Sequence, residues 1–168
     1  LMSKASSLYR CLSKTIFSAS SLLKILNDEI CETTSRGMFV TMIVGVYDKN
    51  KNELLLANAG HEPPLIFSKD GNFKTIDEAG PPLGIAPNFK FAEQIISFKE
   101  SSMYIFTDGI TEMKNNNGEM LGQEGFQDYI KKYQTTPNNK RLQKMIEDLI
   151  SSGRIQKDDL TIVTVDGK

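Results

Sequence analysis

The 168-residue sequence contains little histidine and little cysteine, and this scarcity excludes several kinds of site. Its one histidine, His61, leaves no partner for a histidine-based metal triad. Its two cysteines, Cys11 and Cys31, give neither a zinc-binding spacing nor a disulfide framework. We expect both cysteines to be reduced, core or near-core residues of a cytoplasmic protein.

Strong net charge and long apolar runs are also missing. The 20 Lys and Arg residues balance 21 Asp and Glu residues, so we expect no nucleic-acid role and no attraction to an anionic membrane. No apolar run is long enough to span a bilayer, and the first residues lack the basic start and apolar stretch of a signal peptide. The length is that of one ordinary domain, which builds a core without disulfides or structural metal.

Apolar residues at helical spacing predict a pair of amphipathic helices within residues 1–34, the second capped by one of the serines in 18–21. Because the first stripe begins at Leu1, without an initiator Met or a capping residue, we expect the chain to be an N-terminally truncated fragment of a longer protein. The stripes consist of Leu1, Ala5, Leu8, Leu12 and Ile16, and of Leu22, Leu23, Leu26 and Ile30.

From residue 38 onward the pattern changes to that of β-strands, rich in β-branched and aromatic residues. Polar turns at 48–52 and 69–72 predict hairpins, and two further helices are expected at 122–133 and 137–152. Hairpin-linked strands with separate helices indicate an α+β fold of antiparallel sheets flanked by helices. The predicted strands cover 38–47, 53–59, 64–68, 73–77, 91–98, 102–107 and 160–165, with 91–98 and 102–107 forming one pair.

Asp108 lies where an apolar, aromatic strand runs into an Asp-Gly turn. Such a strand favours burial, so the carboxylate at its end is held at a sheet edge or in a cleft. A carboxylate held in this way suits a hard divalent cation, and Asp-Gly is also a common surface-turn signal. The residues alone leave both interpretations of Asp108 open.

Several short phrases of the sequence fall into one order: Met38-Phe39-Val40-Thr41-Met42, Ala57-Asn58-Ala59-Gly60-His61-Glu62-Pro63-Pro64, Gly80-Pro81-Pro82-Leu83-Gly84, Phe106-Thr107-Asp108-Gly109-Ile110-Thr111-Glu112 and Asp158-Asp159-Leu160-Thr161. In this order and at these separations they resemble the SpoIIE/RsbU-type branch of the PPM (PP2C-like) serine/threonine phosphatases. The resemblance runs from the first helix to the last strand.

The resemblance implies one domain over residues 1–168, with a helical pair at 1–34 and a sandwich core of two antiparallel sheets at 38–168, flanked by helices. It also implies a pair of Mn²⁺ or Mg²⁺ ions, which activate a shared water for in-line attack on a phosphate. The implied substrate is phosphoserine or phosphothreonine on a bacterial regulatory protein, typically an anti-sigma-factor antagonist.

Position by position, the resemblance implies that Asp108 and Asp158 are metal ligands. Asp159, beside the second ligand, ranks next, and the alternative for both Asp158 and Asp159 is that they cap a turn before the strand. Gly109, Asn58 and His61 are candidates for supporting the ligands or lining a substrate loop, with turn formation as the alternative for Asn58 and His61. Thr107, Thr111 and Glu112 flank Asp108 and are candidates for orienting it.

The sequence also departs from the family pattern. It lacks the Asp-rich strand and the Asp-x-Ser-Gly-x-Gly phrase that supply further carboxylates, and residues 1–37 contain only Asp28, Glu29 and Glu32 as acids. It thus keeps about half of the expected ligands, and a cation held by two carboxylates and water binds weakly. We expect the fragment alone to have little or no phosphatase activity.

Two other functions compete with a phosphatase: a non-catalytic PPM-like module that binds a partner protein, and a structural or oligomerising domain. The leading helices are expected to dock an upstream sensor or regulatory domain, or to support a homodimer through exposed apolar surface.

Overall fold

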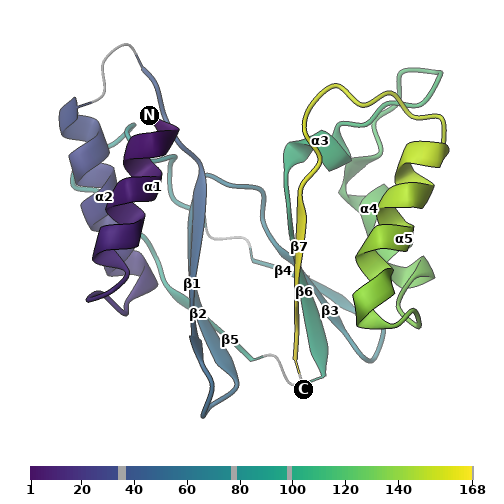
Figure 1. The fold of residues 1–168 in the computed structure, drawn as a ribbon, viewed down its shortest axis with the longest axis horizontal. Helices are drawn as coiled ribbons and strands as arrows, with labels where there is room; N and C mark the ends of the chain where they lie inside the picture. The colour runs from purple at the N-terminus through teal and green to yellow at the C-terminus, as the bar shows by residue number, and fades with distance from the viewer. Residues whose placement is uncertain (34–36, 77–78, 98–99, 168) are drawn as a thin grey trace. The chain divides into compact units, whose positions relative to one another are not determined.

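A computed structural model describes residues 1–33, 37–76, 79–97 and 100–167, and it divides into two compact units (Figure 1). The first unit takes its described residues from Leu1–Pro63, Ile76–Lys99 and Gly167–Lys168, and the second from Pro64–Thr75 and Glu100–Asp166. The chain therefore enters the second unit twice. Each unit has its own sheet, its own helices and its own apolar core.

The first unit contains a helical pair and a three-stranded antiparallel sheet. Both helices and the inner face of the sheet contribute to one apolar core, in which Leu23, Leu26 and Ile30 are completely buried. Apart from Leu1, which is exposed, the apolar stripes seen in the sequence therefore face this core. Its elements are α1 (Met2–Leu12), α2 (Ala19–Thr33), β1 (Met42–Asp48), β2 (Glu53–Ala59) and β5 (Gln94–Ser97), with the strand order β1-β2-β5.

The second unit contains a four-stranded antiparallel sheet with helices against one face (Figure 1). Tyr104 and Phe106 of the sheet pack on Phe126 of α4, which is also fully buried. Its elements are β3 (Leu65–Ser68), β4 (Phe73–Thr75), β6 (Ser101–Phe106), α3 (Asp108–Thr111), α4 (Gly122–Lys132), α5 (Asn138–Ser151) and β7 (Ile162–Asp166), with the strand order β4-β3-β6-β7.

Most predicted elements are confirmed, with shifted ends. The hairpins at 48–52 and 69–72 join β1 to β2 and β3 to β4. Ser18 caps α2 as expected, because its hydroxyl accepts a hydrogen bond from the Ser21 amide at 3.2 Å. The first helix ends at Leu12, while Ile16 still packs on the same core. The predicted ends at residues 34, 77 and 98 lie outside the described residues.

Two predictions are wrong. Strands 91–98 and 102–107 do not form a pair: β5 pairs with β2, and β6 pairs with β3 and β7. The reason is that the two strands, though close in sequence, belong to the sheets of different units. Cys11 is exposed rather than in or near the core, because Ala5, Leu8 and Leu12 are the residues of α1 that pack on the core. Both cysteines are free, as expected.

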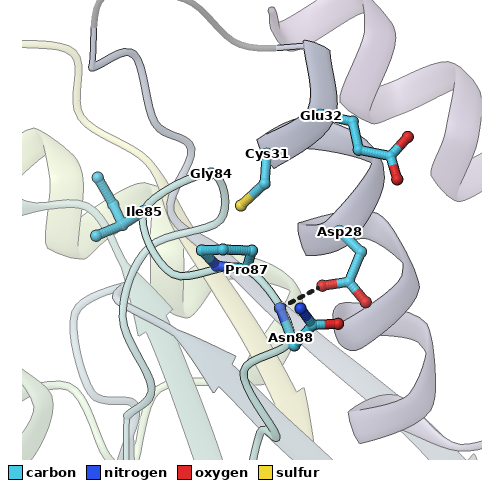
Figure 2. Close-up of a pocket in the computed structure, with 7 residues that line it drawn as sticks. All are labelled: Asp28, Cys31, Glu32, Gly84, Ile85, Pro87 and Asn88. Atoms are coloured by element: carbon cyan, nitrogen blue, oxygen red, sulfur yellow. Dashed lines mark hydrogen bonds between the residues drawn. The ribbon is translucent and has the colours of Figure 1, made fainter.

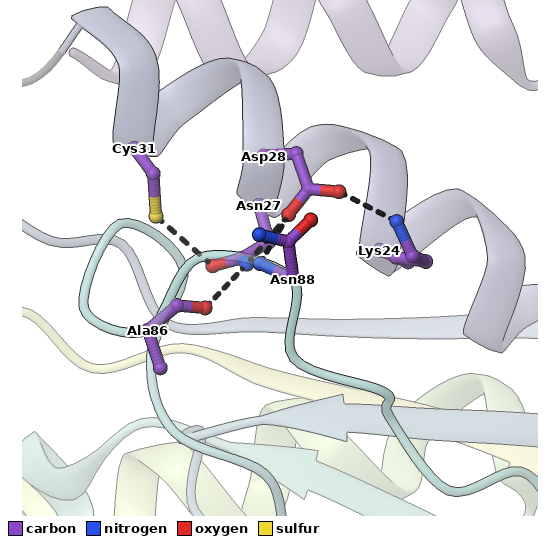
Figure 3. Close-up of polar contacts among 6 residues, drawn as sticks. All are labelled: Lys24, Asn27, Asp28, Cys31, Ala86 and Asn88. Atoms are coloured by element: carbon purple, nitrogen blue, oxygen red, sulfur yellow. Dashed lines mark hydrogen bonds and ion pairs between the residues drawn. The ribbon is translucent and has the colours of Figure 1, made fainter.

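A buried asparagine holds an irregular segment of the first unit against α2 (Figure 3). Asn27 is completely buried, and its side chain donates to the carbonyl of Ala86 at 2.8 Å and accepts from the amide of Gly84 at 3.1 Å. The adjacent Asp28 accepts a hydrogen bond from the amide of Asn88 at 2.8 Å. The hydrogen bond from Lys24 is the main reason why the pKa of the Asp28 carboxyl lies below its ordinary value.

A hollow of about 370 Å³ lies between this segment and α2 (Figure 2). Cys31 points toward it from the helix, and Ile85 and Pro87 border it from the loop. None of the expected site residues lines it; the lining residues are Asp28, Cys31, Glu32, Gly84, Ile85, Pro87 and Asn88.

An ion pair between a buried arginine and a half-buried aspartate joins α5 to β7 in the second unit. The guanidinium of Arg141 contacts the carboxylate of Asp166, which also accepts a hydrogen bond from Ser102 at 2.5 Å. Arg141 lies over the ring of Tyr104, and burial raises the pKa of that tyrosine. Because Ser102 faces Asp166 directly in the ladder, the same carboxylate links helix, edge strand and neighbouring strand.

Among the described residues, no helix combines the length and the apolar character needed to cross a membrane.

We expect Asn27→Ala to lower the free energy of unfolding by about 2 kcal/mol, because it leaves the Gly84 amide and the Ala86 carbonyl without their partner. Urea unfolding followed by circular dichroism measures the change. Asn139→Ala, at an exposed position of α5, is the control and should change stability by less than about 0.5 kcal/mol. Equal effects of the two substitutions would contradict the anchoring role of Asn27.

Candidate metal centre

Asp108 begins the short helix α3 directly after β6. Thr107 is still extended, with φ −89° and ψ 157°, so the chain turns from strand into helix at the acidic residue. Gly109 and Ile110, which follow, are buried, whereas Asp108 itself is exposed. The buried residues fix the turn, and the carboxylate is left accessible to solvent and ligands.

Asp158 and Asp159 lie just before β7, the neighbour of β6 in the sheet. Both are exposed. The Asp159 amide donates to a carboxylate oxygen of Asp158 at 2.7 Å, and the side-chain amide of Gln156 donates to the Asp158 carbonyl at 2.9 Å. These bonds agree with the turn-capping interpretation and leave the remaining carboxylate oxygens available.

The two acidic segments are in contact. The Thr107 amide donates to the Thr161 carbonyl at 3.2 Å, which extends the β6–β7 ladder toward the acids. A Cβ atom placed on Gly109 would lie 2.4 Å from the carbonyl oxygen of Asp159 and 3.4 Å from the carbonyl carbon of Asp158. Only glycine allows the backbone next to Asp108 to come this close to the carbonyl of Asp159.

The chemistry of this donor set fits part of a Mn²⁺ or Mg²⁺ site. Exposed carboxylates are the hard oxygen ligands that these cations prefer, and backbone contacts hold the segments that carry them. Within the described part of the chain, however, no group of three or more His, Cys, Asp or Glu side chains lies together in a metal-binding arrangement. The acidic segments therefore offer an incomplete ligand set.

Asn58 and His61 form a separate local structure in the first unit. Asn58 is 2% exposed, donates to the His61 carbonyl at 2.9 Å and accepts from the His61 amide at 2.9 Å. Gly60, between them, has φ +68°, a conformation that favours glycine. The side chain of Asn58 thus closes the turn, as the structural interpretation requires, and a role in a substrate loop stays a prediction.

Sequence reasoning missed two parts of this arrangement. The backbone contact at Gly109 has no pattern in the sequence beyond the Asp-Gly turn signal. The anchoring role of Asn27 was also missed, although a polar residue within the apolar stripe between Leu23 and Ile30 was a visible signal.

Comparisons with known proteins agree with the phosphatase resemblance. The family model described as "Stage II sporulation protein E (SpoIIE)" matches residues 1–168. Protein IcfG of Synechocystis is 29% identical over 161 residues, covering 90% of this chain and 24% of that protein. Phosphoserine phosphatase RsbU of Bacillus subtilis is 28% identical over 149 residues, covering 87% of this chain and 44% of that protein. The chain thus spans less than half the length of these curated relatives.

Solved structures confirm the fold. The SiaA-PP2C domain of Pseudomonas aeruginosa matches with a TM-score of 0.83 at 14% identity, covering 98% of this chain and 68% of that chain. The RsbU and RsbW domains of a Mycobacterium tuberculosis protein match with a TM-score of 0.78 at 21% identity, covering 97% and 46%. The expected α+β class, with antiparallel sheets flanked by helices, is confirmed.

We expect Gly109→Ala to lower the free energy of unfolding by about 1–3 kcal/mol, because the added methyl group overlaps the Asp159 carbonyl. Urea unfolding measures the loss, and amide chemical shifts at residues 158–161 report the displaced segment. Gly125→Ala in α4 is the control, since its methyl group meets only the flexible end of Leu121 and alanine favours helix. A Gly109→Ala protein as stable as the control would contradict the contact.

Proposed function

Because the chain belongs to the SpoIIE family of PP2C-like phosphatase domains, we propose that it removes phosphate from serine or threonine of a bacterial regulatory protein in a metal-dependent reaction. The observation that carries the proposal is the pair of exposed carboxylates, Asp108 and Asp158, on two segments that touch at Gly109. Exposed carboxylates at the ends of neighbouring strands suit a reaction on another protein, whose phosphorylated side chain reaches them from solvent.

In this proposal Asp108 and Asp158 hold divalent cations, with Asp159 beside them. Bound Mn²⁺ or Mg²⁺ supplies an activated water and neutralises charge on the phosphate. The chain's own task is to present its carboxylates at a fixed spacing, which the β6–β7 ladder and the close approach at Gly109 provide. Asn58 and His61 remain candidates for a substrate loop.

The substrate and partners belong to the same proposal. The relative RsbU is named a phosphoserine phosphatase, which supports phosphoserine as the group that is hydrolysed. We propose that this group lies on a regulatory protein of the anti-sigma-factor antagonist type. The M. tuberculosis structure contains RsbU and RsbW domains of one protein. This supports the proposal that the present domain acts together with other signalling domains, such as an upstream sensor. We place this activity in the cytoplasm, in agreement with two free cysteines.

The incomplete ligand set favours a second candidate. Among the described residues, no three His, Cys, Asp or Glu side chains lie together so that they could hold a metal ion. The alternative is therefore a non-catalytic module that binds a partner protein. For the same reason we propose that residues 1–168 by themselves bind Mn²⁺ weakly and hydrolyse phosphoserine poorly. Robust Mn²⁺-dependent hydrolysis by these residues alone would overturn that part of the proposal.

We expect Asp108→Asn and Asp158→Asn each to reduce Mn²⁺-dependent hydrolysis of a phosphoserine peptide by the intact protein by about 100-fold or more, because each removes a charged oxygen ligand. Asp128→Asn is the control, since Asp128 is an exposed residue of α4 whose nearest cation, Lys131, lies 3.9 Å away. Partner binding without hydrolysis by the unsubstituted protein would favour the binding module instead.

The helical pair is the proposed surface for self-association. Met2 of α1 and Phe17, in the connection between α1 and α2, are 66% and 72% exposed, which is high for large apolar residues. If these side chains are covered in a homodimer, light scattering of the protein should give a dimer mass, and Phe17→Glu should shift it toward the monomer. Ile150→Glu, on an exposed position of α5, is the control. A strict monomer before substitution would contradict self-association.

A further inference from the structure

The side-chain hydroxyl of Thr107 bridges the two acidic segments at the point where the β6–β7 ladder stops. The last pair of residues in the ladder is Phe106 with Ile162. One residue further, the Thr107 hydroxyl accepts a hydrogen bond from the Thr161 amide at 3.1 Å and donates to the Asp159 carbonyl at 3.1 Å. One hydroxyl therefore satisfies both a donor and an acceptor of the segment that carries the acids.

One of these bonds and the contact at Gly109 act on the same peptide group, whereas the other bond holds the amide of the next peptide. The carbonyl of Asp159 is held by the Thr107 hydroxyl and packs against Gly109, where no Cβ atom would fit. Its position is thus set by both residues that flank Asp108. A shift of this carbonyl would move Asp158 and Asp159 relative to Asp108, because all belong to the same short segments.

We propose that Thr107 is a positioning residue that sets the spacing between Asp108 and the Asp158–Asp159 segment, an inference that rests on the proposed metal-dependent function. Thr107 is half-buried, so its hydrogen bonds compete with water and add little to overall stability. Its β-branched side chain restricts rotation, which keeps the hydroxyl directed at the neighbouring segment. The residue acts through the carboxylates and does not itself touch the substrate.

Three substitutions in the intact protein test this role. Thr107→Val keeps the shape and removes both hydrogen bonds, whereas Thr107→Ser keeps the hydroxyl. Thr164→Val makes the same chemical change on β7, away from Asp159 and Thr161. We expect Thr107→Val to weaken Mn²⁺ binding, measured by titration calorimetry, by about 10-fold or more, and Thr107→Ser to stay within about threefold of the unsubstituted protein.

Thermal unfolding of the metal-free proteins separates positioning from general damage. Thr107→Val and Thr164→Val should unfold at similar temperatures, although only the first weakens Mn²⁺ binding. Unchanged Mn²⁺ affinity in Thr107→Val, or an equal loss in Thr107→Ser, would overturn the proposal. If Thr107→Val weakens Mn²⁺ binding but also unfolds at a much lower temperature than Thr164→Val, the loss of affinity reflects general damage to the fold. That outcome would also overturn the proposal.

Hydrogen exchange of the Thr161 amide tests the same bond without metal. Thr107→Val should accelerate this exchange by about 10-fold or more, because the amide loses its acceptor. If the unsubstituted protein binds no Mn²⁺, the proposed function fails, and the exchange rate still decides whether Thr107 holds the segment. Unchanged exchange in Thr107→Val would overturn the positioning role by itself.

Discussion

The close approach between Gly109 and the carbonyl of Asp159 is the constraint on which the arrangement of the acids depends. Two backbone segments distant in sequence come together there more closely than any side chain would allow. The β6–β7 ladder brings the segments into register, and the contact fixes where each of them leaves the sheet. The carboxylates can then stay exposed to solvent while the backbone segments that carry them are packed together.

Irregular segments elsewhere in the chain are held by side chains that bond to backbone groups. Asn27 binds both an amide and a carbonyl of the 84–86 segment, and Asn58 closes its own turn in the same way. Glu93 accepts from the Ser20 amide at 3.0 Å at the start of α2. Each bond gives a backbone amide or carbonyl the hydrogen-bond partner that a helix or sheet would otherwise provide. These segments therefore keep one conformation although they lack regular secondary structure.

Sequence patterns predicted where the helices and strands lie better than which strands pair with each other. Helical and strand periods located the helical pair and both hairpins, because these depend on neighbours in the sequence. The pairing of β5 with β2 was not predictable in this way, since it joins segments about 40 residues apart, such as Leu54 and Ile96. The family resemblance identified Asp108 and Asp158, whose roles as ligands stay a prediction. Gly109 contacts residues that are distant in the sequence, so no periodic pattern of residue types predicts this contact.

The register between β6 and β7 also has a consequence for how this chain can change in length during evolution. Asp159 and Thr161 bond to the Thr107 side chain while Ile162 pairs with Phe106, so adding or removing one residue between Asp159 and Ile162 would break these bonds or shift the ladder. The hairpins at 48–52 and 69–72 carry no such restriction and can accept insertions at their exposed tips. Length differences among related chains should therefore collect in the hairpins and avoid the approach to β7.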